Sequence, residues 1–207
     1  MTRRLTATAI IAIITVAVSA VAMWNGVNYW AVFGGFIPAR MTNQLILQGA
    51  VPAILTPWSS ALLHGNWLHL GINMLMLLFA GGQVERIIGR SALFIAYLLG
   101  ALAAAAAQFA VDPSGTIPMV GASGAISALF GLYALFYGQP KQVTKHRGLN
   151  RGIHVLWLLV TWVVLQWMAG LLAGGEGVIL ATPAHIGGFI AGLLLQRPLL
   201  LWKYRKA

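Results

Sequence analysis

The sequence has no cysteine and only three acidic residues among its 207 positions. The absence of cysteine excludes disulfide bonds, thiolate metal sites and a thiol nucleophile. Charged residues make up 8% of the chain, whereas they make up about a quarter of a typical soluble domain. Hydrophobic residues account for 59% of the chain, and the mean hydropathy is +0.83. We therefore predict an integral membrane protein, because a soluble domain of this length could not bury so much apolar surface.

The few charges that the chain does carry are mostly positive. Lysine and arginine give it a net charge of +10, which in a polar chain would indicate binding to nucleic acid. Here the basic residues lie in short connections between apolar runs, where they report the orientation of a membrane protein. We therefore expect the lipid bilayer as a partner, and no nucleic acid.

Six apolar runs are each about long enough to cross a hydrocarbon core of roughly 30 Å as a helix. They are residues 6–23, 61–80, 92–111, 121–138, 153–173 and 184–202. The first run follows two arginines like a signal peptide, but it lacks a convincing cleavage site, so we interpret it as a retained helix. The predicted fold is all-α and polytopic, with six transmembrane helices in one domain over residues 1–207.

The longest segment that is not predicted to span the membrane is the first loop, residues 24–60. It is rich in tryptophan, glycine and proline, a composition typical of the membrane interface. Within it, residues 41–51 have the pattern of a short amphipathic helix in the headgroup region.

The distribution of basic residues predicts the orientation. If the N-terminus is cytoplasmic, twelve of the thirteen lysines and arginines lie inside, and Arg40 alone lies outside. Such an asymmetry fixes the orientation of a polytopic protein. We expect both termini to be cytoplasmic, in the inner membrane of a bacterium.

This topology gathers five polar residues in the outer half of the membrane. They are His64, His69 and Asn73 in the second run, Ser123 at the start of the fourth and His185 at the start of the sixth. Polar groups at such depth usually face a protein interior or a water-filled cavity. His69 and Asn73 are four residues apart, so they lie on one face of a helix.

These side chains include the groups that an enzyme needs to attack an amide. Ser123 can serve as a nucleophile, His185 as the base, and His69 with Asn73 as donors to the oxyanion. Each also has an ordinary structural explanation. Gly-x-Ser-Gly can be a helix-packing motif, a buried histidine can be a hydrogen-bonded structural group, and an intramembrane asparagine can bond to another helix.

Small residues form two stripes that could bring the serine and the histidine together. They are Gly124, Ala128 and Gly131 in the fourth run, and Gly188 and Gly192 after His185 in the sixth. Small residues permit close contact between membrane helices. Because the serine and the histidine lie in the outer half of the membrane, the predicted active site would open at the outer side.

Taken together, these motifs resemble the rhomboid family of intramembrane serine proteases, over about residues 63–195. The resemblance is carried by His64…His69-x-x-x-Asn73, the connector Gly82-Gln83-Val84-Glu85 to Gly89, Gly121-Ala122-Ser123-Gly124, and Ala184-His185-Ile186-Gly187-Gly188-x-x-x-Gly192. It implies a six-helix fold whose fourth helix starts below a water-filled cavity open to the outside. It also implies a dyad of Ser123 and His185 without an acidic third member.

The resemblance further implies an oxyanion site formed by His69, Asn73 and the Ser123 amide. The substrates would be single-span membrane proteins, cleaved near the outer end of their transmembrane segment, with no metal and no cofactor. As supporting residues of the site we predict His64, Gly121, Gly124, Ser127, Gly188 and Gly192.

The chain departs from the family pattern at two places. The family often has Trp-Arg in the first loop, where this chain has Leu55-Thr56. At Ser127 the family usually has an aromatic ring that stacks on the catalytic histidine, so the imidazole here must be held by the serine hydroxyl or by packing. We interpret Trp157, Trp162 and Trp167 as lipid-facing or packing residues.

Two other functions remain open from the sequence. A catalytically inactive, client-binding relative of the family usually lacks the serine or the histidine, and this chain has both. A proton or ion pathway would usually include an acidic residue within a span, and no Asp or Glu lies in the middle of a predicted span. We therefore favour an intramembrane serine protease.

Overall fold

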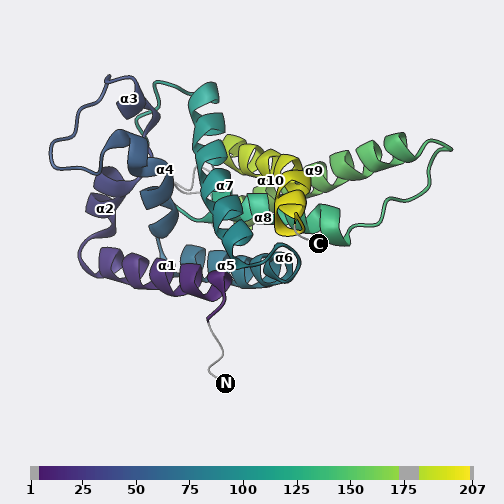
Figure 1. The fold of residues 1–207 in the computed structure, drawn as a ribbon. Helices are drawn as coiled ribbons and strands as arrows, with labels where there is room; N and C mark the ends of the chain where they lie inside the picture. Colours follow the sequence, from purple (N-terminus) through teal and green to yellow (C-terminus); the bar gives the residue numbers. More distant parts are fainter. Residues whose placement is uncertain (1–4, 173–181, 206–207) are drawn as a thin grey trace.

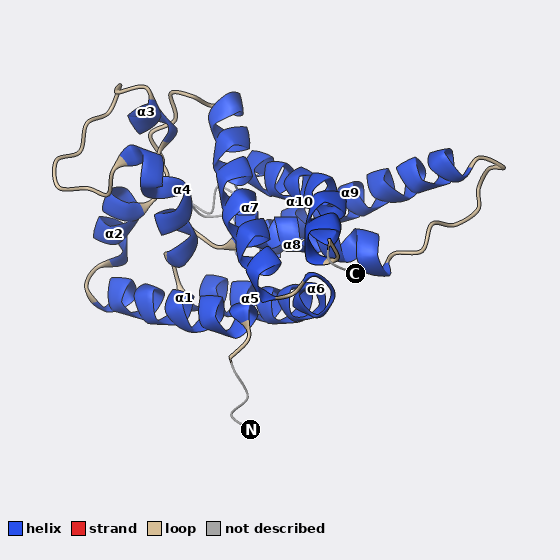
Figure 2. Ribbon diagram, viewed as in Figure 1, coloured by secondary structure: helices blue, strands red, loops and turns tan. Residues whose placement is uncertain are grey.

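The computed structural model of the protein describes residues 5–172 and 182–205, and within these residues it contains helices and no β-strand (Figure 2). The four longest helices are α1, α7, α9 and α10. In chain order the elements are α1 (Ala7–Trp24), α2 (Val27–Gly34), α3 (Pro38–Met41), η1 (Ala53–Leu55), α4 (Thr56–Ser59), η2 (Ser60–Leu62), α5 (Trp67–Met76), η3 (Leu77–Gly81), α6 (Gly82–Ile88), α7 (Arg90–Val111), α8 (Ser123–Tyr137), α9 (Arg147–Leu172) and α10 (Thr182–Lys203).

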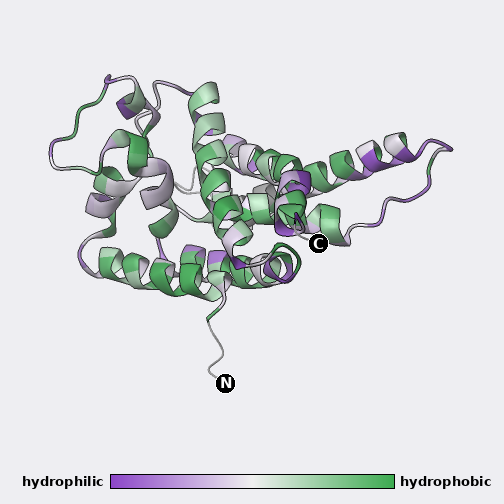
Figure 3. Ribbon diagram, viewed as in Figure 1, coloured by the Kyte–Doolittle hydropathy of each residue, from purple (hydrophilic) through white to green (hydrophobic). Residues whose placement is uncertain are grey.

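Five helical stretches in the described residues are long and apolar enough to cross a membrane. They are Ala7–Trp24, Trp67–Ile88, Arg90–Val111, Arg147–Leu165 and Thr182–Lys203. The helix α8 is also apolar but has 15 residues, so it extends about 22 Å and is shorter than the hydrocarbon core. The protein is an integral membrane protein, and this shorter helix corresponds to the fourth predicted span, residues 121–138. Figure 3 shows the apolar colouring along α1 and the hydrophilic colouring in the connection from α8 to α9.

Two predicted spans differ from the observed helices at their ends. The second starts at Trp67 rather than at residue 61, because Asn66 caps the helix by accepting a hydrogen bond from the His69 N–H at 2.8 Å. It continues through a π-helical turn as far as Ile88. The fifth starts at Arg147 rather than at residue 153, and its predicted end at residue 173 lies outside the described residues. Hydropathy reports burial in lipid, whereas capping side chains decide where a helix begins.

The predicted amphipathic helix over residues 41–51 is wrong. The helix α3 ends at Met41, and the following residues form turns. Asn43 and Gly49 have positive φ angles of 59° and 76°, which are incompatible with a continuous right-handed helix. A hydrogen bond from the Arg40 Nη2 to the Val51 carbonyl, 2.6 Å long, closes this part of the loop.

The helices α7, α8 and α10 form the centre of the bundle, and α9 extends away from it (Figure 1). Glycines on α10 allow this packing, since a Cβ at Gly188 would collide with the Gly124 carbonyl oxygen and one at Gly192 with the Ala128 carbonyl oxygen. The two predicted stripes of small residues therefore face each other. Backbone contact of this kind is typical of membrane helices that present small residues to each other.

The first helix is joined to the end of the second span by a carboxylate. Glu85 on α6 accepts hydrogen bonds from the backbone N–H of Ala7 at 2.7 Å and of Thr8 at 2.9 Å, and from the Thr8 hydroxyl at 2.7 Å. The first N–H groups of a helix have no partner inside the helix. The negative charge of Glu85 therefore satisfies the N-terminus of α1 and stabilises its position against α6.

Candidate active site

The segment before α8 turns sharply at Gly121, whose φ angle is +126°. This φ angle favours glycine. In addition, a Cβ at this position would lie only 2.8 Å from Cε1 of the His69 ring, so there is no space for a side chain. The Gly121 N–H donates to the Ser60 carbonyl at 2.9 Å. Two residues later Ser123 begins α8, so the turn places its side chain at the start of a helix.

The imidazole of His185 lies beside the Ser123 hydroxyl. The distance from Nε2 of His185 to Oγ of Ser123 is 2.7 Å, although the two residues are 62 positions apart in the sequence. This is hydrogen-bonding distance for a base and a nucleophile. His185 is buried, Ser123 is partly exposed, and the Nδ1 atom of His185 has no partner among the residues that the structure describes. The backbone contact between Gly188 and Gly124 brings the two side chains within reach.

The two predicted oxyanion donors lie on α5, and the ring of one of them, His69, lies next to the turn at Gly121. The point that a Gly121 Cβ would occupy is 2.9 Å from Nε2 of His69 and 3.7 Å from Oγ of Ser123. His69 and Ser123 therefore border the same small space. Asn73 is buried one turn below His69, and its Nδ2 donates to the His69 carbonyl at 2.9 Å. This bond occupies one of the two amide N–H groups of Asn73 and leaves the other available.

His64 lies behind the turn and connects it to α1. Its Nδ1 is 2.9 Å from the Ser19 hydroxyl, which in turn donates to the Leu62 carbonyl at 2.8 Å. Its Nε2 accepts a hydrogen bond of 3.4 Å from the Ala122 N–H. His64 thus holds the backbone beside Ser123. Sequence reasoning missed Ser19, because a single serine in an apolar helix gives no sign of its distant partner.

Ser127 makes one hydrogen bond within α8 and one to α9. Its hydroxyl donates to the Ser123 carbonyl at 2.8 Å and accepts a hydrogen bond of 3.1 Å from Nε1 of Trp162. In the described part of the chain it makes no hydrogen bond to His185. Of the three tryptophans predicted to be lipid-facing or packing residues, Trp162 is a packing residue with 5% of its surface exposed, and Trp157 is 61% exposed. The side chain of Trp167 lies outside the described residues.

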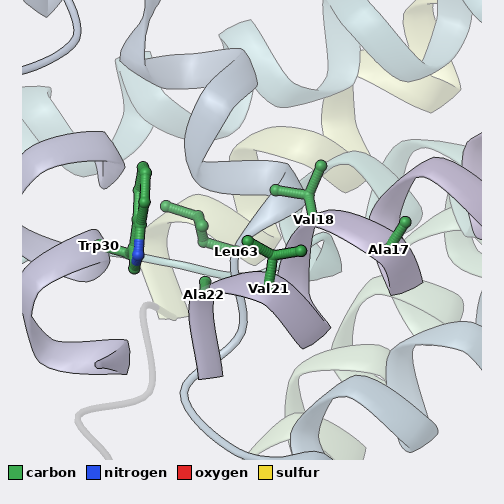
Figure 4. A pocket seen from close by; sticks show the side chains of 6 residues that line it. All are labelled: Ala17, Val18, Val21, Ala22, Trp30 and Leu63. Carbon is green, nitrogen blue, oxygen red and sulfur yellow. The ribbon is translucent and has the colours of Figure 1, made fainter. Parts of the chain in front are cut away.

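Two apolar hollows lie apart from the dyad. The first, of about 270 Å³, is formed by α1, α2 and Leu63, and all its lining residues are apolar or aromatic (Figure 4). The second, of about 290 Å³, lies between α5, α8, α9 and α10. Neither is lined by Ser123 or His185. Among residues 5–172 and 182–205, no three His, Asp or Glu side chains are placed to hold a metal ion.

Comparison with known proteins places most of this chain in one family. The rhomboid domain matches residues 53–202. The chain is 33% identical to the rhomboid protease GlpG of Pectobacterium atrosepticum over 138 residues, which are 67% of this chain and 46% of that protein. It is 32% identical to RHOMBOID-like protein 5 of Arabidopsis thaliana over 139 residues, or 67% of this chain and 42% of that protein. The matches thus span less than half the length of these relatives. Because the rhomboid domain covers well over half of the chain, the chain belongs to the rhomboid family.

Proposed function

We propose that the protein is an intramembrane serine protease that cleaves single-span membrane proteins near the outer end of their transmembrane segment. The observation that carries this proposal is the 2.7 Å contact between Nε2 of His185 and Oγ of Ser123 at the start of a short, apolar helix. The names of the GlpG relatives, which describe them as rhomboid proteases, support it. A nucleophile at the start of a helix shorter than the bilayer can lie below the membrane surface and still be open to one side.

In the proposed reaction, His185 carries the proton in both the acylation and the hydrolysis step. Ser123 Oγ attacks the carbonyl carbon of the substrate while its proton moves to Nε2 of His185. The C–N bond then breaks, and the protonated imidazole gives that proton to the leaving nitrogen. Water attacks the resulting ester and passes a proton to His185. Release of the carboxylic acid returns this proton to Ser123, so that the enzyme is regenerated.

Each attack on the carbonyl carbon, by Ser123 and later by water, produces a negatively charged oxygen. Hydrogen-bond donors close to Ser123 are needed to stabilise it. The Ser123 N–H belongs to the first turn of α8, where backbone N–H groups have no partner inside the helix and carry the positive end of the helix dipole. His69 borders the same space, and Asn73 retains one N–H group. We assign these three groups to the oxyanion, because donors aimed at the developing charge act mainly on the transition state.

A client-binding protein without catalysis is the alternative function. Such a protein would need neither the hydroxyl nor the imidazole, and it would not require them at 2.7 Å from each other. The hydrogen-bonded pair therefore favours the protease. The proposed location is the inner membrane of a bacterium, with both termini cytoplasmic and the active site open to the outer side, because twelve of the thirteen basic residues then lie inside.

The test combines cleavage with active-site labelling. The purified protein in lipid vesicles is incubated with a single-span substrate and, separately, with a fluorescent fluorophosphonate that reacts with activated serines. We expect cleavage within the substrate's transmembrane region and labelling of Ser123, and both should disappear in Ser123→Ala and in His185→Ala. The double variant should be no worse than either single variant, because the pair acts as a unit. Cleavage that persists in Ser123→Ala, or labelling that moves to Ser114, would refute the assignment.

A further inference from the structure

We propose that Trp162 on α9 is a positioning residue of the active site, acting through Ser127 on the helix that carries the nucleophile. The proposal rests on the proposed function, because it concerns how the Ser123–His185 pair is held. It assigns to α9 a role that its own sequence does not indicate. The docked position of α9 and the geometry of the dyad would then change together.

The first observation is the burial of Trp162 on a stretch of α9 whose other side chains are half-buried or exposed. Between residues 151 and 165 of α9, Trp162 is the one buried side chain. Its neighbours Trp157, Val160 and Val164 are each half exposed or more. Trp162 is thus the one buried side chain by which that stretch contacts α8 and α10, and the partly buried Leu158 and Leu159 pack beside it.

The second observation is where the indole lies. Its ring stacks on Phe130 of α8, with centroids 4.3 Å apart and an interplanar angle of 26°, and it lies 6.4 Å from Phe189 of α10 at 20°. Phe189 is one helical turn after His185, and Ser127 is one turn after Ser123. The indole therefore packs against both dyad-bearing helices, one turn below the reacting atoms.

The third observation is a chain of two hydrogen bonds. Nε1 of Trp162 donates to Oγ of Ser127, and the Ser127 hydroxyl donates to the Ser123 carbonyl. An indole nitrogen can only donate, and a hydroxyl can donate one proton and accept another. The chain thus runs in one direction from α9 to the backbone of the nucleophile. The hydroxyl of Ser127 can therefore make both bonds at once.

The surroundings explain why the ring comes from α9 and not from residue 127. A Cβ at Gly188 would lie 3.2 Å from the Ser127 Cβ, so α10 leaves little room for a large side chain there. On another side, Trp162, Phe130 and Phe189 line the apolar cavity of about 290 Å³, which Ser127 does not line. The indole therefore has space to move away from Ser127. Such a movement would remove the donor from Ser127 and break the stacking of α9 on α8.

The test compares the removal of each partner with the removal of both. Ser127→Ala leaves a buried indole N–H without an acceptor, which costs more than the net value of one hydrogen bond. We expect a loss of about fivefold or more in the rate at which the fluorophosphonate labels Ser123. Trp162→Phe keeps a ring and removes the donor, and we expect a smaller loss than in Ser127→Ala, about two- to fourfold. The double variant Ser127→Ala/Trp162→Phe should recover to the rate of Trp162→Phe.

A distance measurement gives a readout that does not depend on activity. The chain has no cysteine, so spin labels can be attached at Leu156→Cys on α9 and Leu98→Cys on α7, which are both exposed. We expect Ser127→Ala to broaden the distance distribution between the labels, and the double variant to narrow it again. Trp157→Phe is the matched control, because it changes an exposed tryptophan on the same helix, and it should change neither rate nor distance.

Each remaining outcome contradicts the proposal. If the losses from Ser127→Ala and Trp162→Phe multiply in the double variant, the two residues act independently. If Ser127→Ala slows labelling while the distance stays the same, α9 has no part in the effect. An active wild-type protein whose variants all react at the wild-type rate would overturn this inference and leave the proposed function intact, whereas a wild-type protein without serine labelling would overturn the proposed function itself.

Discussion

The carbonyl oxygen of Gly124 on α8 lies against Gly188 on α10, at a place where any side chain would collide with it. The contact is one residue after Ser123 on one helix and three residues after His185 on the other. It therefore sets how closely the two helices can approach at the level of the dyad. We therefore expect the 2.7 Å contact between His185 and Ser123 to require glycine at position 188.

Enlarging that residue should separate the dyad. In Gly188→Ala we expect α10 to shift away from α8 and cleavage to fall at least tenfold, with a loss of stability of about 1–3 kcal/mol from overpacking. Turnover and thermal unfolding of the purified protein measure the two effects. Gly152→Ala on α9 is the control, because a Cβ there meets nothing within 4 Å. Full activity in Gly188→Ala would mean that the helix contact does not position the histidine.

The turn before the nucleophile should be equally intolerant of a side chain. Gly121→Ala would place a Cβ 2.8 Å from the His69 ring and force an L-residue to keep a φ angle of +126°. The left-handed conformation costs roughly 1–2 kcal/mol, and relief of either strain moves His69 or the turn. We expect fluorophosphonate labelling of Ser123 to slow at least fivefold.

The control for that variant is Gly65→Ala. Gly65 lies in the same region, its φ angle is not positive, and a Cβ there has open space. Labelling at the wild-type rate in Gly121→Ala, alongside the same rate in Gly65→Ala, would show that the turn adapts without affecting the nucleophile.

The proposed oxyanion donors should affect turnover more than binding. We expect Asn73→Ala and His69→Ala to lower kcat with little change in KM, because such donors act on the transition state at roughly 3 kcal/mol for a strong one. Steady-state cleavage of a transmembrane substrate provides both constants. Because Asn73 also bonds to the His69 carbonyl, unfolding is monitored in parallel. An effect confined to KM would indicate substrate binding, and one confined to stability would indicate a purely structural role.

The cysteine-free chain makes its orientation simple to measure. Single cysteines at Ser114, before α8, and at Gln142, between α8 and α9, both replace exposed residues. With an impermeant maleimide added to intact cells, we expect labelling at position 114 alone, because the basic connection after α8 should be cytoplasmic. Labelling at position 142 from outside would reverse the orientation and place the active site on the cytoplasmic side.

The sequence by itself was sufficient for the broad architecture. A chain with 59% hydrophobic and 8% charged residues must lie in a bilayer, and the spacing of its connections predicts where the helices run. The first, third and sixth predicted spans agree with α1, α7 and α10 to within two residues. Hydropathy is summed over about 20 residues, so it is robust to any single position.

Local sequence motifs also predicted which residues the fold brings together. Ser123 and His185 meet at hydrogen-bonding distance, and His69 lies beside the Gly121 turn. The stripes of small residues, which predict helix contact, account for this meeting. The catalytic roles of these residues remain predictions, because proximity alone does not establish reaction.

Tertiary structure alone decided the details that depend on how one helix is rotated against another. The bonds from Ser19 to His64 and from Trp162 to Ser127 join residues 45 and 35 positions apart. No periodicity in either segment indicates such a partner, because the energy of a side-chain hydrogen bond depends on a few tenths of an ångström in helix position. The first loop also depends on tertiary contacts. Asn43 and Gly49 have positive φ angles there, so the chain turns where the amphipathic pattern predicts a helix.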